Sequence, residues 1–430
     1  MKTSARARIL LSLAIIIIVT SVCLPSIFSN ADGQQQQLLQ TIKKRNLTIE
    51  LDRQQQILTR AQLTMPAVGE GPFPAVLLIH GSGAADMDGY IPPELSGTET
   101  GARIFLQIAE YLSERGFVVL RYDKRGLGEN ATILDANVFG NATVQQLQRD
   151  AEVVLDVLMQ QPEVDRGNIT LLGISEGTTI APRIGAERPD DVKNIVLMSA
   201  ASQTLYDIMY ANLVNRTILF AQELWDDNHD GLLSLQEVLA HPGAYLTIPA
   251  SSPAATTTGD NFTATAAANN SNTLISNIDT ANATTDNTTI SGQTFTRQQW
   301  YPGLDANNDT LVEINRELIP FALALFEQMA ADPWLQSHKE IAPNLVAIEN
   351  LRPAIGILIL QGEEDNQTYL EQALLLEQKL TQMKFPDHTL ITYPGLGHTF
   401  HPAQGLLQPL GSIENYVLAD LHTWLKDHDK

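Results

Sequence analysis

The chain has 430 residues, 44% of them hydrophobic, which is enough to bury a full α/β domain and a smaller second unit. This composition and its regular patterning exclude an intrinsically disordered protein. A formal net charge of -22 argues against nucleic acid and against an anionic membrane surface as partners.

Residues 1–31 are predicted to be a targeting segment that lies outside the fold. Lys2, Arg6 and Arg8 precede a charge-free stretch, which is typical of a secretory signal peptide or of a membrane anchor. We therefore expect an exported protein that is secreted or held at the outer face of the cell membrane. The single cysteine, Cys23, lies in this segment, so the mature chain is expected to contain no disulfide.

Beyond this segment, short apolar runs alternate with amphipathic helical patterns. The predicted strands are residues 47–51, 57–63, 75–79, 117–122, 168–172, 194–198, 357–365 and 390–393. The predicted helices are residues 102–115, 144–159, 178–187, 369–383 and 413–425. This alternation predicts an α/β fold with a mostly parallel sheet and helices on both faces, built from residues 32–202 and 353–430.

Glycines follow the strand predicted at 75–79, in His80-Gly81-Ser82-Gly83. They allow backbone N–H groups to approach a developing alkoxide. The N–H of Ser82 and the N–H of Glu176 are the candidate oxyanion-hole donors. Asp86-Met87-Asp88-Gly89 comes next and resembles a fragment of a calcium loop. Because it lacks further ligands, we interpret it as an ordered turn that supports the oxyanion loop.

A charged group, Arg121-Tyr122-Asp123-Lys124-Arg125, ends the following predicted strand. Such a group can face a substrate, because it lies near the predicted catalytic edge of the sheet. It can also form buried ion pairs beneath the loops of the site. We favour the buried ion-pair cluster.

Ser175 lies in Gly173-Ile174-Ser175-Glu176-Gly177, between the strand predicted at 168–172 and the helix predicted at 178–187. A strand, a glycine-flanked turn and a helix in this order are typical of a nucleophile elbow, in which a strained turn lifts the serine hydroxyl clear of the sheet. The candidate partners follow in chain order. Asp365 comes after the next long apolar strand, and His398 lies in a glycine-rich loop after the last one.

Residues 203–352 are predicted to be an insertion that forms a cap over the site. Its middle, about residues 249–292, is rich in Thr, Ala, Asn and Ser and cannot bury enough surface to fold alone. Glycosylation sequons gather there, at Asn261, Asn269, Asn282 and Asn287, in agreement with an exported glycoprotein.

The insertion contains the full pattern of an EF-hand calcium loop at residues 226–237. Its expected ligands are Asp226, Asn228, Asp230, the Leu232 carbonyl, Ser234 through a water, and Glu237. Gly231 supplies the sharp turn, and Leu233 is the apolar anchor. The alternative is a polar turn followed by a helix. Calcium is the cofactor we predict, in a structural role.

A degenerate second loop follows at residues 305–316. Its expected ligands are Asp305, Asn307, Asp309, Leu311 and Glu313. Thr310 replaces the turn glycine, and Arg316 occupies the twelfth position with Glu317 one residue late, so the bidentate ligand is missing unless the backbone shifts. We predict that this loop pairs with the first one. Trp225, Trp300 and Tyr301 are expected to pack in the core of the cap.

Taken together, the His80-Gly81-Ser82-Gly83, Arg121-to-Gly126 and Gly173-to-Gly177 motifs resemble those of the α/β hydrolases. The likeness is closest to esterases related to the prolyl-oligopeptidase and dienelactone-hydrolase branches, and it covers residues 46–202 and about 353–430. The resemblance favours Asp365 over Glu363 and Glu364 as the acid, because this fold usually places its acid three residues after the glycine that ends the strand.

The resemblance implies acyl transfer, with Ser175 as nucleophile, His398 as general base and Asp365 orienting the imidazole. We predict a carboxylesterase with a small or medium ester as substrate and no organic cofactor. Two alternatives stay open, namely a peptidase that cleaves short peptides and a non-catalytic, calcium-dependent surface binding protein. Fold by itself does not decide between them.

Overall fold

The computed structural model describes residues 41–241, 300–301, 303–404 and 409–429, together with the backbone of short strands between residues 247 and 299. The predicted targeting segment 1–31 and most of the stretch 249–292, with its sequons, lie outside the described residues. Within the described part, no helix combines the length and the apolar character needed to cross a membrane.

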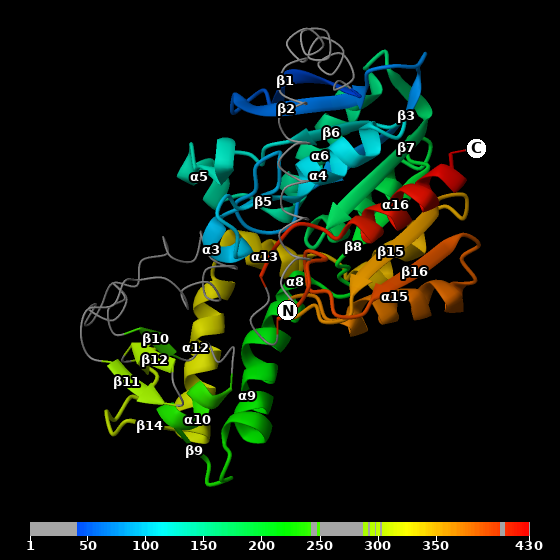
Figure 1. Ribbon diagram of the computed structural model, residues 1–430. Helices are drawn as coiled ribbons and strands as arrows, with labels where there is room; N and C mark the ends of the chain where they lie inside the picture. Colours follow the sequence, from blue (N-terminus) through cyan, green and yellow to red (C-terminus); the bar gives the residue numbers. More distant parts are fainter. Residues whose placement is uncertain are drawn as a thin grey trace, which may run out of the picture.

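An eight-stranded sheet forms the centre of the molecule, with the strand order β1-β2-β6-β3-β7-β8-β15-β16 (Figure 1). Only β1 and β2 are antiparallel to their neighbours, and every pair from β6 to β16 is parallel. The strands are β1 (Ile42–Asp52), β2 (Ile57–Pro66), β3 (Phe73–Ile79), β6 (Val118–Tyr122), β7 (Val164–Ile174), β8 (Asn194–Met198), β15 (Gly356–Gly362) and β16 (His388–Tyr393).

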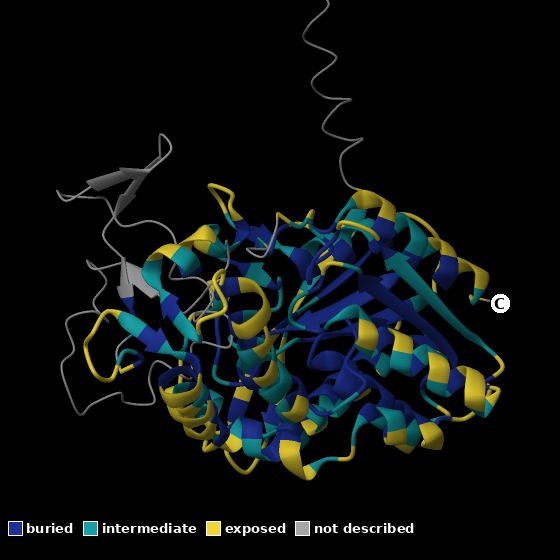
Figure 2. Ribbon diagram, turned by 90° about the horizontal axis from the view of Figure 1, so that it is seen from below, coloured by how far each residue is buried: buried dark blue, intermediate teal, exposed yellow. Residues whose placement is uncertain are grey.

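Helices cover both faces of this sheet. On one face pack α4 (Ile104–Ser113) and α16 (Asn415–Asp427), and on the other pack α6 (Val144–Met159), α7 (Gly177–Glu187) and α15 (Leu370–Met383). Figure 1 shows α16 and α15 on opposite sides of the sheet. The strands are buried between helices whose outer faces are exposed (Figure 2).

The sequence of β3 explains this double layer. Leu77 and Ile79 belong to the core on one face, whereas Val76 and Leu78 belong to the core on the other. Successive side chains of a strand point to opposite faces, so a strand buried on both sides needs a continuous apolar run. The predicted α/β fold class is therefore confirmed.

The elements differ from the predicted ones mainly at their ends. β7 begins at Val164, four residues before the predicted strand, because Val164 pairs with Phe73 ahead of an irregularity in which the extra residues belong to β7. The helix predicted from residue 102 begins at Ile104, because β5 (Ala102–Arg103) pairs with β4 (Tyr90–Ile91) instead. Short helices α3 (Pro93–Ser96) and α5 (Ala136–Gly140) lie in the loops after β3 and β6.

The insertion is built mainly of helical segments that extend away from the sheet (Figure 1). Tyr206 and Tyr210 pack edge-on against Phe326, with ring centroids 5.1 and 5.0 Å away, and these contacts join the first helix of the insertion to the long helix that contains Phe326. The segments are α8 (Leu205–Tyr210), a π-helix (Ala211–Arg216), α9 (Thr217–Phe220), a π-helix (Ala221–Trp225), α10 (Leu235–Ala240), a π-helix (Ile314–Leu318), α12 (Ile319–Ala330), α13 (Pro333–Glu340) and α14 (Asn344–Ala347).

The two predicted calcium loops are paired at the far end of the insertion. β9 (Leu232–Ser234) and β14 (Leu311–Glu313) form an antiparallel ribbon in which Leu233 lies opposite Val312. Both side chains are fully buried in a small core that also contains Trp225 and Trp300. The predicted pairing is thus present, and its side chains form a core separate from that of the sheet.

This small core predicts the local stability of the loop pair. Leu233→Ala should lower the free energy of opening of the β9–β14 ribbon by about 2–5 kcal/mol, because it removes a fully buried side chain and leaves a cavity. Hydrogen exchange of the ribbon amides measures this change. The matched control is Leu224→Ala, which truncates a side chain in the same insertion that is 45% exposed, and equal loss of protection in both variants would contradict the prediction.

Candidate active site

Ser175 occupies a strained turn between β7 and α7. Its φ is +53°, a left-handed conformation that non-glycine residues rarely adopt. A Cβ on Gly173 would collide with the carbonyl oxygen of Gly177, and a Cβ on Gly177 would collide with that of Ile79. The two glycines are therefore required so that strand, turn and helix can pack this closely, as in a nucleophile elbow.

This turn lies where the strand order of the sheet reverses. From β3 the chain continues to β6 on one side and later to β7 on the other, and the crevice at such a point is where open α/β sheets bind ligands. The loop after β3 closely approaches the serine, because a Cβ on Gly81 would lie 3.3 Å from the Cβ of Ser175. The Ser175 N–H donates to the Met198 carbonyl (3.0 Å), which ties the turn to the end of β8.

Asp365 and His398 meet at the same edge of the sheet. His398 Nδ1 lies 2.9 Å from both carboxylate oxygens of Asp365, and both side chains are buried. The His398 carbonyl accepts a hydrogen bond from the Ser199 hydroxyl (2.5 Å), which anchors the loop. Of the rival acids, Glu363 accepts from the Thr392 hydroxyl (2.7 Å) and Glu364 is exposed, so the structure joins only Asp365 to the imidazole.

The surroundings of Asp365 keep it ionised. Burial alone would raise its pKa, but His398 and the N–H groups of Gln367 and Thr368 outweigh burial, so the pKa of Asp365 is lowered from its ordinary value. Gln361 Nε2 donates a further hydrogen bond at 3.0 Å. An ionised Asp365 accepts a hydrogen bond from the Nδ1–H of His398, so the proton stays on Nδ1 and Nε2 is the basic nitrogen.

Ser175 Oγ and His398 Nε2 form no hydrogen bond with each other, although both residues lie in the described part of the chain. Among the hydrogen bonds of the described residues, the imidazole is engaged only through Nδ1, with Asp365 and at 3.4 Å with Thr368. Hydrogen bonds between nucleophile and base are often long without substrate and tighten in the substrate complex. The nucleophile and the base are thus each positioned at the same edge of the sheet.

The candidate oxyanion donors face no competing acceptor. Across the described residues, neither the Ser82 N–H nor the Glu176 N–H donates a hydrogen bond to another protein group. The Glu176 N–H stands at the N-terminal end of α7, where the helix dipole favours negative charge. Backbone donors without partners at this position are what an oxyanion hole requires.

The side chain of Glu176 was missed by sequence reasoning, which considered only its N–H. Its carboxylate is fully buried and lies 2.9 Å from Lys124 Nζ. It also accepts hydrogen bonds from Trp334 Nε1 (2.6 Å) and His338 Nε2 (2.9 Å), both on α13 of the insertion. Lys124 belongs to the charged group after β6, which could have drawn attention to it. Nothing in the sequence relates Trp334 and His338 to the serine turn.

The charged group after β6 forms the buried ion-pair cluster that we favoured. Arg125 makes a bidentate pair with Asp150 (2.6 and 2.7 Å), and Asp123 accepts from Arg60 (2.7 Å). Arg121 pairs with Asp88. The Asp86-to-Gly89 segment is an ordered turn, with the Asp86 carboxylate accepting from the N–H groups of Asp88 and Tyr90.

His80, the first residue of the oxyanion loop, is a neutral structural residue. It is fully buried, and its Nε2 is hydrogen-bonded to the carbonyl of Tyr122. Its ring stacks on Phe105 at a centroid distance of 4.7 Å. Burial lowers the pKa of His80 to about 3, so the side chain carries no charge at neutral pH.

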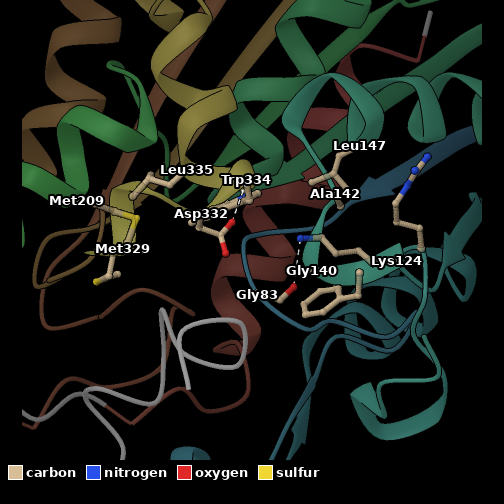
Figure 3. A pocket seen from close by; sticks show the side chains of 12 residues that line it. Gly83, Lys124, Gly140, Ala142, Leu147, Met209, Met329, Asp332, Trp334 and Leu335 are labelled. Carbon is tan, nitrogen blue, oxygen red and sulfur yellow. Dashed lines mark hydrogen bonds between the residues drawn. The ribbon is translucent and has the colours of Figure 1, made fainter. Parts of the chain in front are cut away.

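A largely apolar pocket lies between the oxyanion loop and the insertion (Figure 3). Its volume of about 60 Å³ is several times the roughly 10–15 Å³ that one water molecule requires. Gly83 and Lys124 border it on the core side, and Asp332 and Trp334 border it on the insertion side. The apolar lining includes Phe139, Leu147, Met209, Met329 and Leu335.

The first calcium-type loop is ordered by its own carboxylates. Asp226 accepts from the N–H groups of Asp230 (3.1 Å) and Gly231 (2.8 Å), and Asp230 accepts from that of Leu232 (2.8 Å). Glu237 accepts from the N–H of Ser234 (2.9 Å). Within the described residues, no three or more His, Cys, Asp or Glu side chains converge as a metal site.

The second loop repeats the backbone of the first. Asp305 accepts from the N–H groups of Asp309 (3.2 Å) and Thr310 (3.0 Å). Thr310 has a φ of +75°, close to the +81° of Gly231 at the equivalent position. A threonine here is strained, because left-handed backbone favours glycine.

The backbone shift that loop 305–316 requires is also present. A π-helix at Ile314–Leu318 accommodates one extra residue in its turn, so Glu317 turns toward the loop while the Arg316 side chain is 82% exposed. The Glu317 carboxylate accepts from the N–H groups of Ala306 (3.0 Å) and Glu313 (2.8 Å). The sequence analysis made the bidentate ligand depend on a backbone shift, and the π-helical turn is that shift.

A known family and a known esterase each resemble part of this chain. Residues 95–226 match the family described as "Serine aminopeptidase, S33". Esterase EstD of Thermotoga maritima is 33% identical over 148 residues, which are 34% of this chain and 32% of that esterase. The eight-stranded, mostly parallel sheet with helices on both faces is the α/β-hydrolase fold.

Solved structures similar to this chain include a hypothetical protein from Pseudomonas aeruginosa, with a TM-score of 0.47 and 17% identity over 90% of this chain and 94% of that one. Est1E from Butyrivibrio proteoclasticus has a TM-score of 0.44 and 14% identity over 89% and 98% of the two chains. The chain spans about a third of the length of the esterase from Thermotoga maritima. Its own activity is therefore argued from the site.

The contact between His398 and Asp365 predicts the effect of Asp365→Asn. This variant should lower kcat by about 10³- to 10⁴-fold on any ester that the wild type hydrolyses, because an amide no longer fixes the imidazole tautomer. Steady-state kinetics measures the loss. Glu363→Gln, the same carboxylate-to-amide change two residues earlier in the chain, serves as the control and should retain wild-type kcat.

The depressed pKa of Asp365 also predicts a pH dependence. A lowered pKa means that the ionised form stabilises the folded state above the ordinary value of 3.8, and that this stabilisation is lost as pH falls through the folded-state pKa. The difference in unfolding free energy between wild type and Asp365→Asn should therefore be larger at pH 7 than in acid. Denaturant titrations at several pH values measure it, and a difference that grows on acidification would contradict the prediction.

Proposed function

We propose that this α/β hydrolase is a serine carboxylesterase that works by acyl transfer. His398 Nε2 takes the Ser175 proton as the hydroxyl attacks the ester carbonyl, and Asp365 stabilises the imidazolium. The N–H groups of Ser82 and Glu176 receive the negative charge on the carbonyl oxygen. Water then releases the acyl group by the same route and restores the serine.

The observation that carries this proposal is the conformation of Ser175 at the switch point of the sheet. A serine with a φ of +53°, flanked by two obligatory glycines, represents strain that a merely structural turn does not need. The buried His398–Asp365 pair at the same edge supports it. The similar protein from Thermotoga maritima is named an esterase, in agreement with ester hydrolysis.

The pocket suggests the substrate class. Its methionines, leucines and aromatic rings favour an apolar acyl or alcohol group of small or medium size. Met209 and Met329 come from the insertion, and the unbranched, flexible methionine side chain adapts to ligands of different shape. We therefore propose a small or medium ester with an apolar group as the substrate.

A peptidase that cleaves short peptides is the second candidate, and the description of the matched family favours it. Ester and peptide hydrolysis pass through the same acyl-enzyme. They differ in the leaving group, which is an alcohol in the first and an amine in the second. Parallel kinetics with p-nitrophenyl esters and with aminoacyl anilides bearing the same acyl part distinguishes them. A higher kcat/KM on the anilides would replace the esterase proposal by the peptidase one.

We also propose that calcium binds loop 226–237 and braces the insertion. Asp226, Asn228, Asp230 and Glu237 offer the hard oxygen ligands that calcium prefers. Loop 305–316, with its first three ligands and with Glu317 turned inward, is proposed as a second site. We propose in addition that the protein is exported, with the targeting segment either cleaved or retained. Outside the cell it would meet calcium at the millimolar concentrations that such loops need.

The nucleophile is tested by covalent labelling. A fluorophosphonate probe should label the purified protein at Ser175, and Ser175→Ala should abolish labelling, because only an activated serine reacts with such probes. Fluorescent gel analysis and mass spectrometry of the labelled peptide measure this. Absence of labelling in folded protein would favour the non-catalytic binding protein instead.

Calcium binding is tested by terbium luminescence. Trp225 precedes Asp226 directly, so it should sensitise terbium bound in loop 226–237. The signal should disappear in an Asp226→Ala, Glu237→Ala double variant and should be displaced by calcium. An Asp305→Ala, Glu317→Ala double variant is the matched control for the other loop, and a signal that persists when the first loop is altered would refute this site.

A further inference from the structure

The peptide between Gly81 and Ser82 is held from its carbonyl side. Lys124 Nζ donates to the Gly81 carbonyl oxygen at 2.5 Å and lies 3.3 Å from the Gly83 carbonyl oxygen. In a trans peptide the carbonyl and the N–H point in opposite directions. A cation that fixes the Gly81 carbonyl therefore also fixes the direction of the Ser82 N–H, and it polarises that N–H into a stronger donor.

The same lysine is tied to the other oxyanion donor. Its Nζ lies 2.9 Å from the carboxylate of Glu176, the residue whose N–H is the second donor. A buried ion pair thus joins the loop after β3 to the first residue before α7. The two N–H groups come from distant parts of the sequence, and Lys124 is the side chain that contacts both segments.

The insertion completes the arrangement. Trp334 and His338, both on α13, donate hydrogen bonds to the other carboxylate oxygen of Glu176, Oε1, at 2.6 and 2.9 Å. Burial alone would raise the pKa of Glu176, but Lys124, His338 and Trp334 outweigh it and lower that pKa well below its ordinary value. The carboxylate is therefore ionised, and it needs all three partners because it has no contact with water.

We propose that Lys124 and the Glu176 side chain are positioning residues that set the geometry of the oxyanion hole, and that α13 of the insertion holds them in place through Trp334 and His338. This inference rests on the proposed acyl-transfer function. It assigns the insertion a role in transition-state stabilisation in addition to lining the pocket. If α13 moves away, the Glu176 carboxylate loses the hydrogen bonds from Trp334 and His338, beside the oxyanion donors.

The test compares single and double removal of the ion pair in the full-length protein. Lys124→Met and Glu176→Gln each leave one buried partner unmatched, so each should be less stable than wild type. The double variant removes both charges and should regain much of that thermal stability. If the pair positions the donors, kcat per active site, counted by fluorophosphonate titration, should stay about 10- to 100-fold low in the double variant as well.

A second readout follows the oxyanion itself. A trifluoromethyl ketone forms a tetrahedral adduct with serine whose oxygen occupies the oxyanion hole, so its affinity should fall in parallel with kcat while KM for the ester changes little. Trp334→Phe, which keeps an aromatic side chain and removes the N–H donor, should show a smaller loss of the same kind. Asp150→Asn disrupts the equally buried Arg125–Asp150 pair and should lose stability without losing kcat per titrated site.

The outcomes separate this inference from the function on which it rests. A wild-type protein that neither hydrolyses esters nor reacts with the fluorophosphonate overturns the proposed function and this inference with it. An active wild type whose double variant regains kcat together with stability overturns the inference alone. Parallel loss of kcat and ketone affinity in a stable double variant supports it.

Discussion

The contact between the Ser175 turn and the end of β3 constrains the rest of the site. Gly177 lies so close to the Ile79 carbonyl that no side chain fits, and Gly81 is in tight contact with the Ser175 turn. This close packing places the serine hydroxyl and the oxyanion loop side by side at the reversal of strand order. His398 and Asp365 lie at the same edge of the sheet, and the pocket is bordered by Gly83 of the oxyanion loop.

Buried charge links this fixed point to the insertion. Lys124, Glu176 and His338 are nearly inaccessible to water, and in such surroundings an ionised group without partners costs several kcal/mol. The insertion therefore contributes more than a covering layer, because its helix α13 satisfies a carboxylate that the sheet domain leaves incomplete. Stability of the insertion and geometry of the oxyanion hole depend on the same contacts.

The paired loops at the other end of the insertion show how backbone geometry compensates for sequence. Loop 305–316 lacks the turn glycine and carries its late glutamate one residue out of place, yet Thr310 adopts a left-handed φ and a π-helical turn directs Glu317 inward. The hydrogen bonds of its first carboxylate repeat those of loop 226–237. Pairing of β9 with β14 and the core around Leu233 hold both loops in this geometry.

The sequence by itself determined the α/β class and nearly every strand and helix of the sheet domain, because strands buried on both faces require continuous apolar runs and their helices require amphipathic ones. It also indicated the positions of Ser175, Asp365 and His398, since glycine-flanked turns at strand ends are local features. Only the tertiary structure decided that Asp365 and not its glutamate neighbours contacts the imidazole, and that Trp334 and His338 reach Glu176 across about 160 residues of chain. Such contacts arise from the packing of distant elements against one another, and short-range periodicity carries no information about them.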